Sequence, residues 1–151
     1  MQTSPFDRSP LQGALTLLLG AALYTVLLPQ AVSMAAALPA PSFLDAIDDR
    51  HLRFWAWNQA LHTSIVLLLA LPFAWALSRL YARRLLPAAL LVVMPTLVWM
   101  GLDYLMMRDA LPDAPPVMNL FYAIDAAKVL LVLPLLSLLL RARAARTERP
   151  A

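Results

Sequence analysis

Four long apolar segments decide what this chain of 151 residues can fold into. Segments at about 11–29, 60–78, 85–106 and 118–140 contain only three Asp, Glu, Lys or Arg side chains between them. A helix rises about 1.5 Å per residue and a bilayer core is about 30 Å thick, so roughly 20 residues cross it. Lipid offers the backbone no hydrogen-bond partner, which favours helices. The sequence therefore predicts an all-α integral membrane bundle of four transmembrane helices, with residues 1–151 as a single domain.

The composition supports this prediction. Hydrophobic residues make up 62% of the chain and charged residues 14%, whereas a soluble domain is about half apolar and about a quarter charged. Cysteine is absent, which excludes disulfides, thiolate metal sites and cysteine nucleophiles.

The positions of the basic residues predict an orientation. Arg79, Arg83 and Arg84 lie between the second and third segments, and four further arginines fill the tail at 141–151. The positive-inside rule then puts both termini in the cytoplasm, in an N-in/C-in topology typical of a bacterial inner membrane. The net charge of +3 is interpreted as anchoring to the anionic lipid bilayer, and binding of nucleic acid is not expected.

The first segment and the loop after it leave alternatives open. Arg8, the apolar run and the small residues at 33–36 resemble a cleavable secretory signal, although Asp7 and the length of the run count against it. In the outer loop at 30–59, Ser42 stands three residues before Asp45 in a capping-box spacing. A short interfacial helix is expected there, either as an ordered connector or as a docking surface for a partner.

A stripe of small residues runs along the first segment. Gly13, Thr16 and Gly20 recur at helical spacing, and small residues let another membrane helix approach closely. This pattern indicates helix association, with a membrane-protein partner or by self-association.

Ionisable side chains inside the segments are the best functional signal, because burying them in lipid is costly. Counted at about 1.5 Å per residue from the cytoplasmic ends, they all reach a level roughly 20–27 Å up. Asp125 and Lys128 are spaced i, i+3 and are predicted to pair. We expect a polar cluster open to the outside, as a ligand or ion site. Its candidate residues are His62, Asp103, Asp125, Lys128, Tyr24, Trp99 and Tyr122.

A structural interpretation competes with the ligand site, since the same residues can simply hold the helices together. Catalysis is the weakest reading, and we predict no catalytic residues. His51 and His62 lack the i, i+4 spacing of a helical metal site, so no metal is expected. Three glycines in the chain argue against a phosphate-binding loop, and no cofactor is predicted.

Two functions remain after these exclusions. The leading prediction is a small non-enzymatic membrane protein that acts through helix–helix association, as an accessory or assembly subunit or as a homo-oligomer. The alternative is a small transporter or ligand-binding membrane protein that uses the outward-facing polar site on the second, third and fourth segments.

Overall fold

The computed structural model describes residues 10–81, 83–110 and 116–147, and all regular structure within them is helical. Each of the four α-helices is long and apolar enough to span a membrane. This confirms the predicted all-helical fold with four possible spans. The elements are α1 (Pro10–Ala36), the 3₁₀ helix η2 (Ser42–Ala46), α2 (Arg50–Leu80), α3 (Leu85–Ala110) and α4 (Pro116–Thr147).

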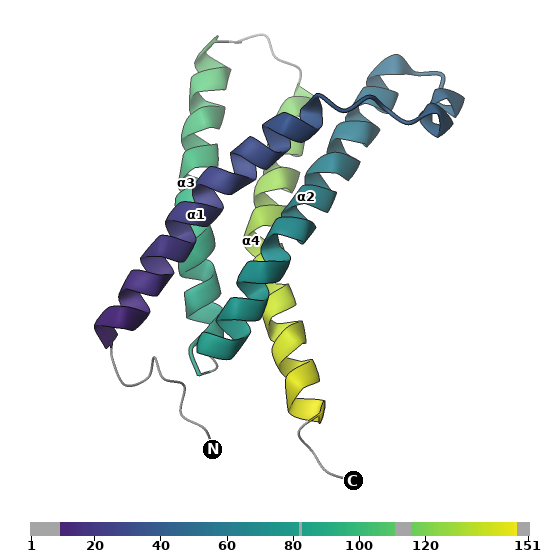
Figure 1. Ribbon diagram of the computed structural model, residues 1–151. Coiled ribbons are helices and arrows are strands. Elements are labelled where there is room, and N and C mark those ends of the chain that lie inside the picture. The colour runs from purple at the N-terminus through teal and green to yellow at the C-terminus, as the bar shows by residue number, and fades with distance from the viewer. Residues whose placement is uncertain (1–9, 82, 111–115, 148–151) are drawn as a thin grey trace.

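The four helices run alternately up and down in one bundle (Figure 1). The start of α1, the α2–α3 connection and the end of α4 lie at one end of the bundle, which we call the proximal end. The α1–α2 connection, the end of α3 and the start of α4 lie at the opposite, distal end. Helix α4 packs against both α2 and α3, while α1 packs mainly against α3.

The helices are longer than the predicted spans. Helix α1 continues to Ala36 and α2 begins at Arg50, so the connection between them is shorter than the predicted loop at 30–59. Asp49 begins α2, because its side chain accepts hydrogen bonds from the backbone N–H groups of His51 (2.8 Å) and Leu52 (3.1 Å). Such a cap satisfies two amides that have no partner inside the helix.

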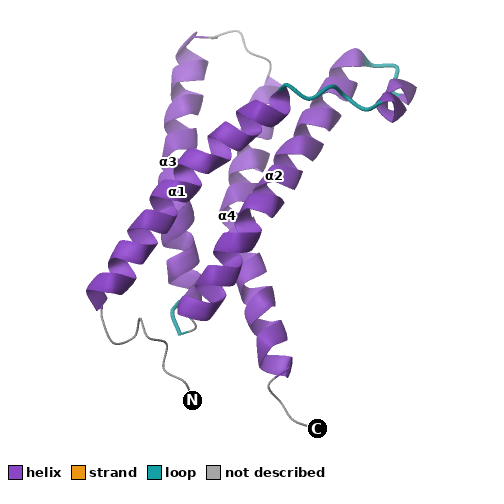
Figure 2. Ribbon diagram, viewed as in Figure 1, coloured by secondary structure: helices purple, strands orange, loops and turns teal. Residues whose placement is uncertain are grey.

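The predicted capping box at Ser42 is wrong. Pro41 precedes η2, and no side-chain hydrogen bond caps it. The carboxylate of Asp45 instead accepts a hydrogen bond from Arg53 of α2 at 2.6 Å, and Arg53 also donates to the carbonyl of Ile47 at 2.7 Å. These contacts tie η2 to the first turn of α2. Figure 2 shows this connection projecting beside α2; its contact with a membrane surface stays a prediction.

Small side chains allow the helices to approach closely in the core. Ala70, Ala74 and Ala89 are fully buried, and membrane helices pack through such residues because lipid provides no hydrophobic drive between them. Two residues of the predicted small-residue stripe of α1, Gly13 and Gly20, also contact other parts of the bundle. The Tyr81 hydroxyl donates to the carbonyl of Gly13 at 2.6 Å, and a Cβ at Gly20 would lie 3.8 Å from a side-chain carbon of α3. These two glycines therefore allow close packing within the chain, while association of the stripe with a partner stays a prediction.

The Asp49 cap yields a pH prediction. Hydrogen bonds from the backbone N–H groups of Leu52 and His51 lower the pKa of Asp49 from its usual 3.8. A carboxylate with a lowered pKa stabilises the folded state above its unfolded pKa, and this contribution is lost as the pH falls through the lowered value. We expect hydrogen–deuterium exchange to show less protection of these two amides, relative to their intrinsic exchange rate at the same pH, in Asp49→Ala, and in the wild type once the pH falls through the lowered pKa.

The matched controls are Asp49→Asn and Asp48→Ala. An asparagine still caps but does not titrate, so its protection should not change with acidification. Asp48 is exposed next to the cap, and its loss should leave both amides protected. Equal exchange in Asp48→Ala and Asp49→Ala would show that the cap does not hold this end of α2.

Candidate functional site

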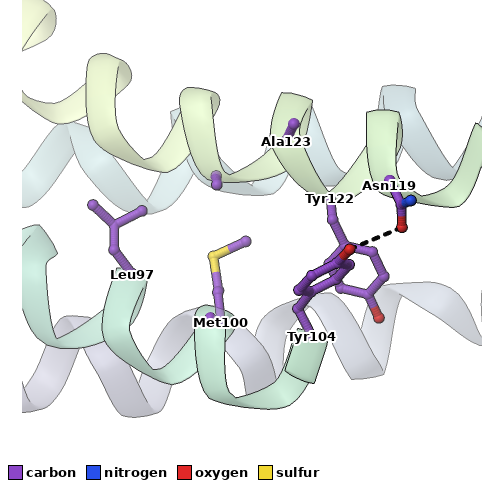
Figure 3. A pocket seen from close by; sticks show the side chains of 8 residues that line it. Leu97, Met100, Tyr104, Asn119, Tyr122 and Ala123 are labelled. Carbon is purple, nitrogen blue, oxygen red and sulfur yellow. Dashed lines mark hydrogen bonds between the residues drawn. The ribbon is translucent and has the colours of Figure 1, made fainter. Parts of the chain in front are cut away.

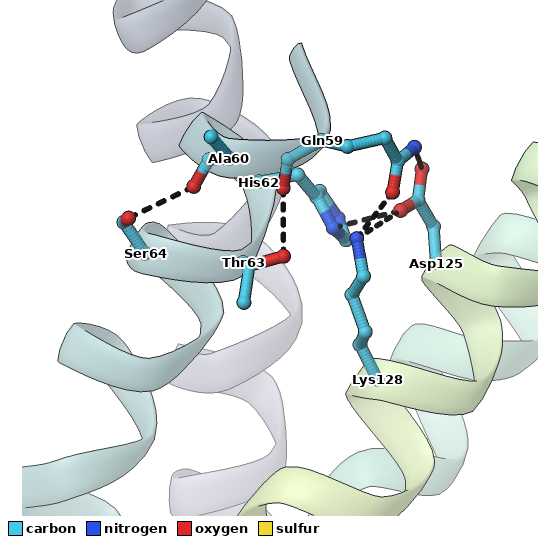
Figure 4. A network of polar contacts seen from close by, with 7 residues as sticks. All are labelled: Gln59, Ala60, His62, Thr63, Ser64, Asp125 and Lys128. Carbon is cyan, nitrogen blue, oxygen red and sulfur yellow. Dashed lines mark hydrogen bonds and ion pairs between the residues drawn. The ribbon is translucent and has the colours of Figure 1, made fainter. Parts of the chain in front are cut away.

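A polar cluster joins the distal halves of α2 and α4. Gln59 and His62 lie three residues apart on α2, and Asp125 and Lys128 lie three residues apart on α4. Residues at this spacing share one face of a helix, so each helix presents two polar side chains to the other. Figure 4 shows all four pointing into the contact between α2 and α4.

Every member of the cluster has a polar neighbour. Lys128 Nζ donates to Asp125 Oδ1 at 3.1 Å and also donates to Gln59 Oε1. The amide nitrogen of Gln59 donates to Asp125 Oδ2 at 3.5 Å. His62 Nδ1 lies 3.0 Å from Asp125 Oδ1, although the two atoms are not aligned as a regular hydrogen bond. Asp125 is thus the shared acceptor of the cluster.

The cluster is shielded from solvent and carries balanced charge. The side chains of His62, Lys128 and Asp125 are only 12%, 18% and 24% exposed. Asp125 and Lys128 carry opposite charges, and their pairing reduces the cost of placing them between apolar helices. The amide of Gln59 contributes both a donor and an acceptor across the contact. This geometry indicates that the cluster holds α2 and α4 together through polar contacts.

An aromatic pair covers the distal side of the cluster. The rings of Trp55 and Phe121 stack with centroids 4.3 Å apart and planes 9° apart. Trp55 lies one helical turn before Gln59, and Phe121 one turn before Asp125. Since α2 and α4 both begin at the distal end, these rings lie between the cluster and that end. An opening of the cluster toward the distal end is therefore not favoured at this point.

The remaining candidate residues lie apart from the cluster. Tyr24 is fully buried in the core, where its ring meets that of Phe73 edge-on at 5.2 Å, and its hydroxyl has no hydrogen-bond partner among the described residues. Tyr122 donates to the sulfur of Met107 at 2.8 Å. Of the seven candidates, the structure thus brings His62, Asp125 and Lys128 into one cluster. Whether they bind a ligand stays a prediction.

Asp103 and Trp99 are exposed on α3. Thr96, on the same stripe of the helix, is fully buried and its hydroxyl lies 3.0 Å from that of Thr25 in α1. Toward the distal end α1 leaves α3 and runs toward the start of α2 (Figure 1). The face of α3 that α1 covers at Thr96 is therefore uncovered two turns later at Asp103.

A groove between the distal halves of α3 and α4 was not predicted. Its volume is about 420 Å³ and its walls are mostly apolar, with a polar rim where Tyr104 donates to Asn119 Oδ1 at 3.0 Å. Figure 3 shows the lining side chains. Tyr104 and Asn119 are the signal in the sequence that could have indicated it, as polar residues in two neighbouring apolar segments. The lining residues are Leu97, Met100, Gly101, Tyr104, Asn119, Tyr122, Ala123 and Ala126.

Comparison of the chain with protein-family models, with curated proteins and with solved structures finds no match. Its function is therefore inferred from its own residues.

The cluster predicts strong coupling between Asp125 and Lys128. Removing one partner of a buried ion pair leaves an uncompensated charge, which costs roughly 3–5 kcal/mol when burial is complete. This pair keeps some exposure, so Asp125→Asn or Lys128→Met should cost somewhat less. The double variant should be less destabilised than the sum of the two, because it leaves no unpaired charge. Unfolding in detergent micelles titrated with a denaturing surfactant measures the three free energies.

The exposed ion pair of Arg53 and Asp45 supplies a matched control for this double-mutant cycle. Its carboxylate is 68% exposed, and exposed ion pairs contribute about 0–1 kcal/mol, so Arg53→Gln and Asp45→Asn should show little coupling. Additive effects of the Asp125 and Lys128 substitutions would show that the two side chains are not coupled and would contradict a stabilising role of the cluster.

Proposed function

We propose that this chain is a small non-enzymatic membrane protein that acts through helix–helix association, as an accessory or assembly subunit or as a homo-oligomer. The observation that carries the proposal is the open groove between the distal halves of α3 and α4. In the proposed orientation both termini lie in the cytoplasm of a bacterial inner membrane, as the arginines at the proximal end favour.

Gly101 makes the groove suitable for another helix. It is exposed on the rim of the groove, and a Cβ built on it would meet no other atom within 4 Å. A glycine at a lipid-facing position lets a second helix approach closely and lay its side chains into the neighbouring groove. The other two glycines of the chain, Gly13 and Gly20, already contact other parts of the bundle.

Two exposed residues of α3, Asp103 and Trp99, also favour an interface on the distal half of this helix. Asp103 is exposed and belongs to none of the ion pairs among the described residues. Trp99 is 56% exposed. A carboxylate at the edge of a membrane span gains from a polar partner, and tryptophan contributes large contact area at interfaces. A second helix on α3 would supply both contacts.

The groove also favours a second candidate function, the binding of a small molecule. Its volume of about 420 Å³ lies within the roughly 300–1,000 Å³ of small-molecule sites, which are mostly apolar with a few polar groups. Here Asn119 and Tyr122 would provide the polar contacts. The shielded cluster at Asp125 gives this function less support than the groove does, because Trp55 and Phe121 cover its distal side.

Photo-crosslinking from Gly101→Cys tests the proposal. The chain has no cysteine, so a single introduced thiol can carry a benzophenone probe without background. We expect irradiation in native membranes to join the labelled chain to a protein, because a helix in the groove lies next to the probe. The mass of the adduct distinguishes a second copy from a different subunit.

Ser64→Cys is the matched control. Ser64 is exposed on α2, roughly 24 Å from the proximal end of its helix, and Gly101 lies roughly 24 Å from the proximal end of α3. The two probes thus sit at the same depth, and only the one at Gly101 should form a protein adduct. Equal protein adducts at both sites, or none at Gly101, would contradict association through this groove; a small-molecule adduct alone would favour the second candidate.

A further inference from the structure

A second groove lies at the proximal end, between the start of α1 and the start of α3. Its volume is about 560 Å³. Leu17 of α1 and Leu91 of α3 form apolar walls, and Gly13 and Ala88 are buried at its base. Small residues at the base leave space that larger side chains would fill. The result is an apolar cleft between two lipid-facing helices.

Two arginines stand at the mouth of this groove. Arg83 and Arg84 belong to the connection between α2 and α3, and both line the groove and are exposed. None of the groove's lining residues is acidic, and no ion pair among the described residues involves either arginine. Within the described part of the chain, the mouth thus presents two positive charges that no acidic side chain pairs.

The hydroxyl of Tyr81 fixes one edge of the groove. It donates to the carbonyl of Gly13 at 2.6 Å, which joins the end of α2 to the first turn of α1. The walls and the charged mouth are therefore held together by a contact within the chain. A pre-formed site binds with less loss of conformational freedom than one that must assemble.

We propose that this proximal groove binds an anionic phospholipid, with an acyl chain between α1 and α3 and the phosphate at Arg83 and Arg84. An amphiphile with an acidic headgroup matches an apolar cleft whose basic mouth lies at the end of the spanning helices. Guanidinium groups bind phosphate oxygens with paired hydrogen bonds, and basic pockets between membrane helices are suited to acidic headgroups. The proposal does not rest on the distal groove or on the proposed function.

The test compares phosphatidylglycerol with phosphatidylcholine of the same acyl chains. The purified full-length protein in detergent receives both lipids in equal amounts, and native mass spectrometry counts the retained molecules. We expect one phosphatidylglycerol molecule to remain bound per protein. The complex with phosphatidylglycerol should be on the order of tenfold more abundant than the complex with phosphatidylcholine, because two arginines lie near the headgroup. Equal retention of the two lipids by the wild type would overturn the proposal without any variant.

Paired substitutions separate this site from general attraction of the basic end. Arg83→Gln with Arg84→Gln should abolish the preference, while Arg141→Gln with Arg146→Gln, which removes the same charge at the end of α4, should keep it. An equal loss of the preference in both double variants would show that the basic end attracts the lipid only through its general charge, and it would overturn the proposed site. Thermal unfolding confirms that each variant is folded; if the first pair fails to fold, the wild-type comparison and the next variant decide.

Ala14→Phe tests the apolar part of the groove. Ala14 is exposed and lines the groove, so a phenylalanine there fills the cleft without entering the core. We expect the bound lipid to be lost although both arginines remain. Retention of the lipid in this variant, or its full displacement by inorganic phosphate, would show an anion site without an acyl chain and overturn the proposal.

Discussion

Asp125 would be an uncompensated charge among apolar helices if Lys128, Gln59 and His62 did not surround it. Lipid and apolar side chains provide no solvent for such a group, so α2 and α4 must face each other with these residues in register. That contact fixes the rotation of the two helices about their axes. The stacked rings of Trp55 and Phe121, one turn toward the distal end, follow from the same register.

The arrangement of the other helices follows from this pair. Helix α3 packs on the remaining side of α4, and α1 packs on α3 through Gly20 and the contact between Thr25 and Thr96. Helix α1 leaves α3 toward the distal end. The bundle is consequently closed at its polar interior and uncovered along the distal half of α3, beyond Thr96. This is where an interaction with another molecule is geometrically simplest.

The apolar segments predicted the fold class well, because crossing a bilayer demands long uncharged helices. The contact between Asp125 and Lys128 could also be predicted, since i, i+3 spacing places both on one face of any helix. The position of Asp103 could not. Thr96 and Asp103 share a stripe in sequence, yet only the crossing angle of α1, which depends on packing, decides which of them is covered. Gly101 and Asn119 likewise form a groove only after two helices are placed.

The central claim is that this chain associates with another chain through contacts between membrane helices. Native mass spectrometry of the protein extracted gently from its own membrane tests it most directly. The account predicts a stoichiometric complex, either with further copies of this chain or with another membrane protein. A chain that remains monomeric under conditions that preserve known membrane complexes would contradict it.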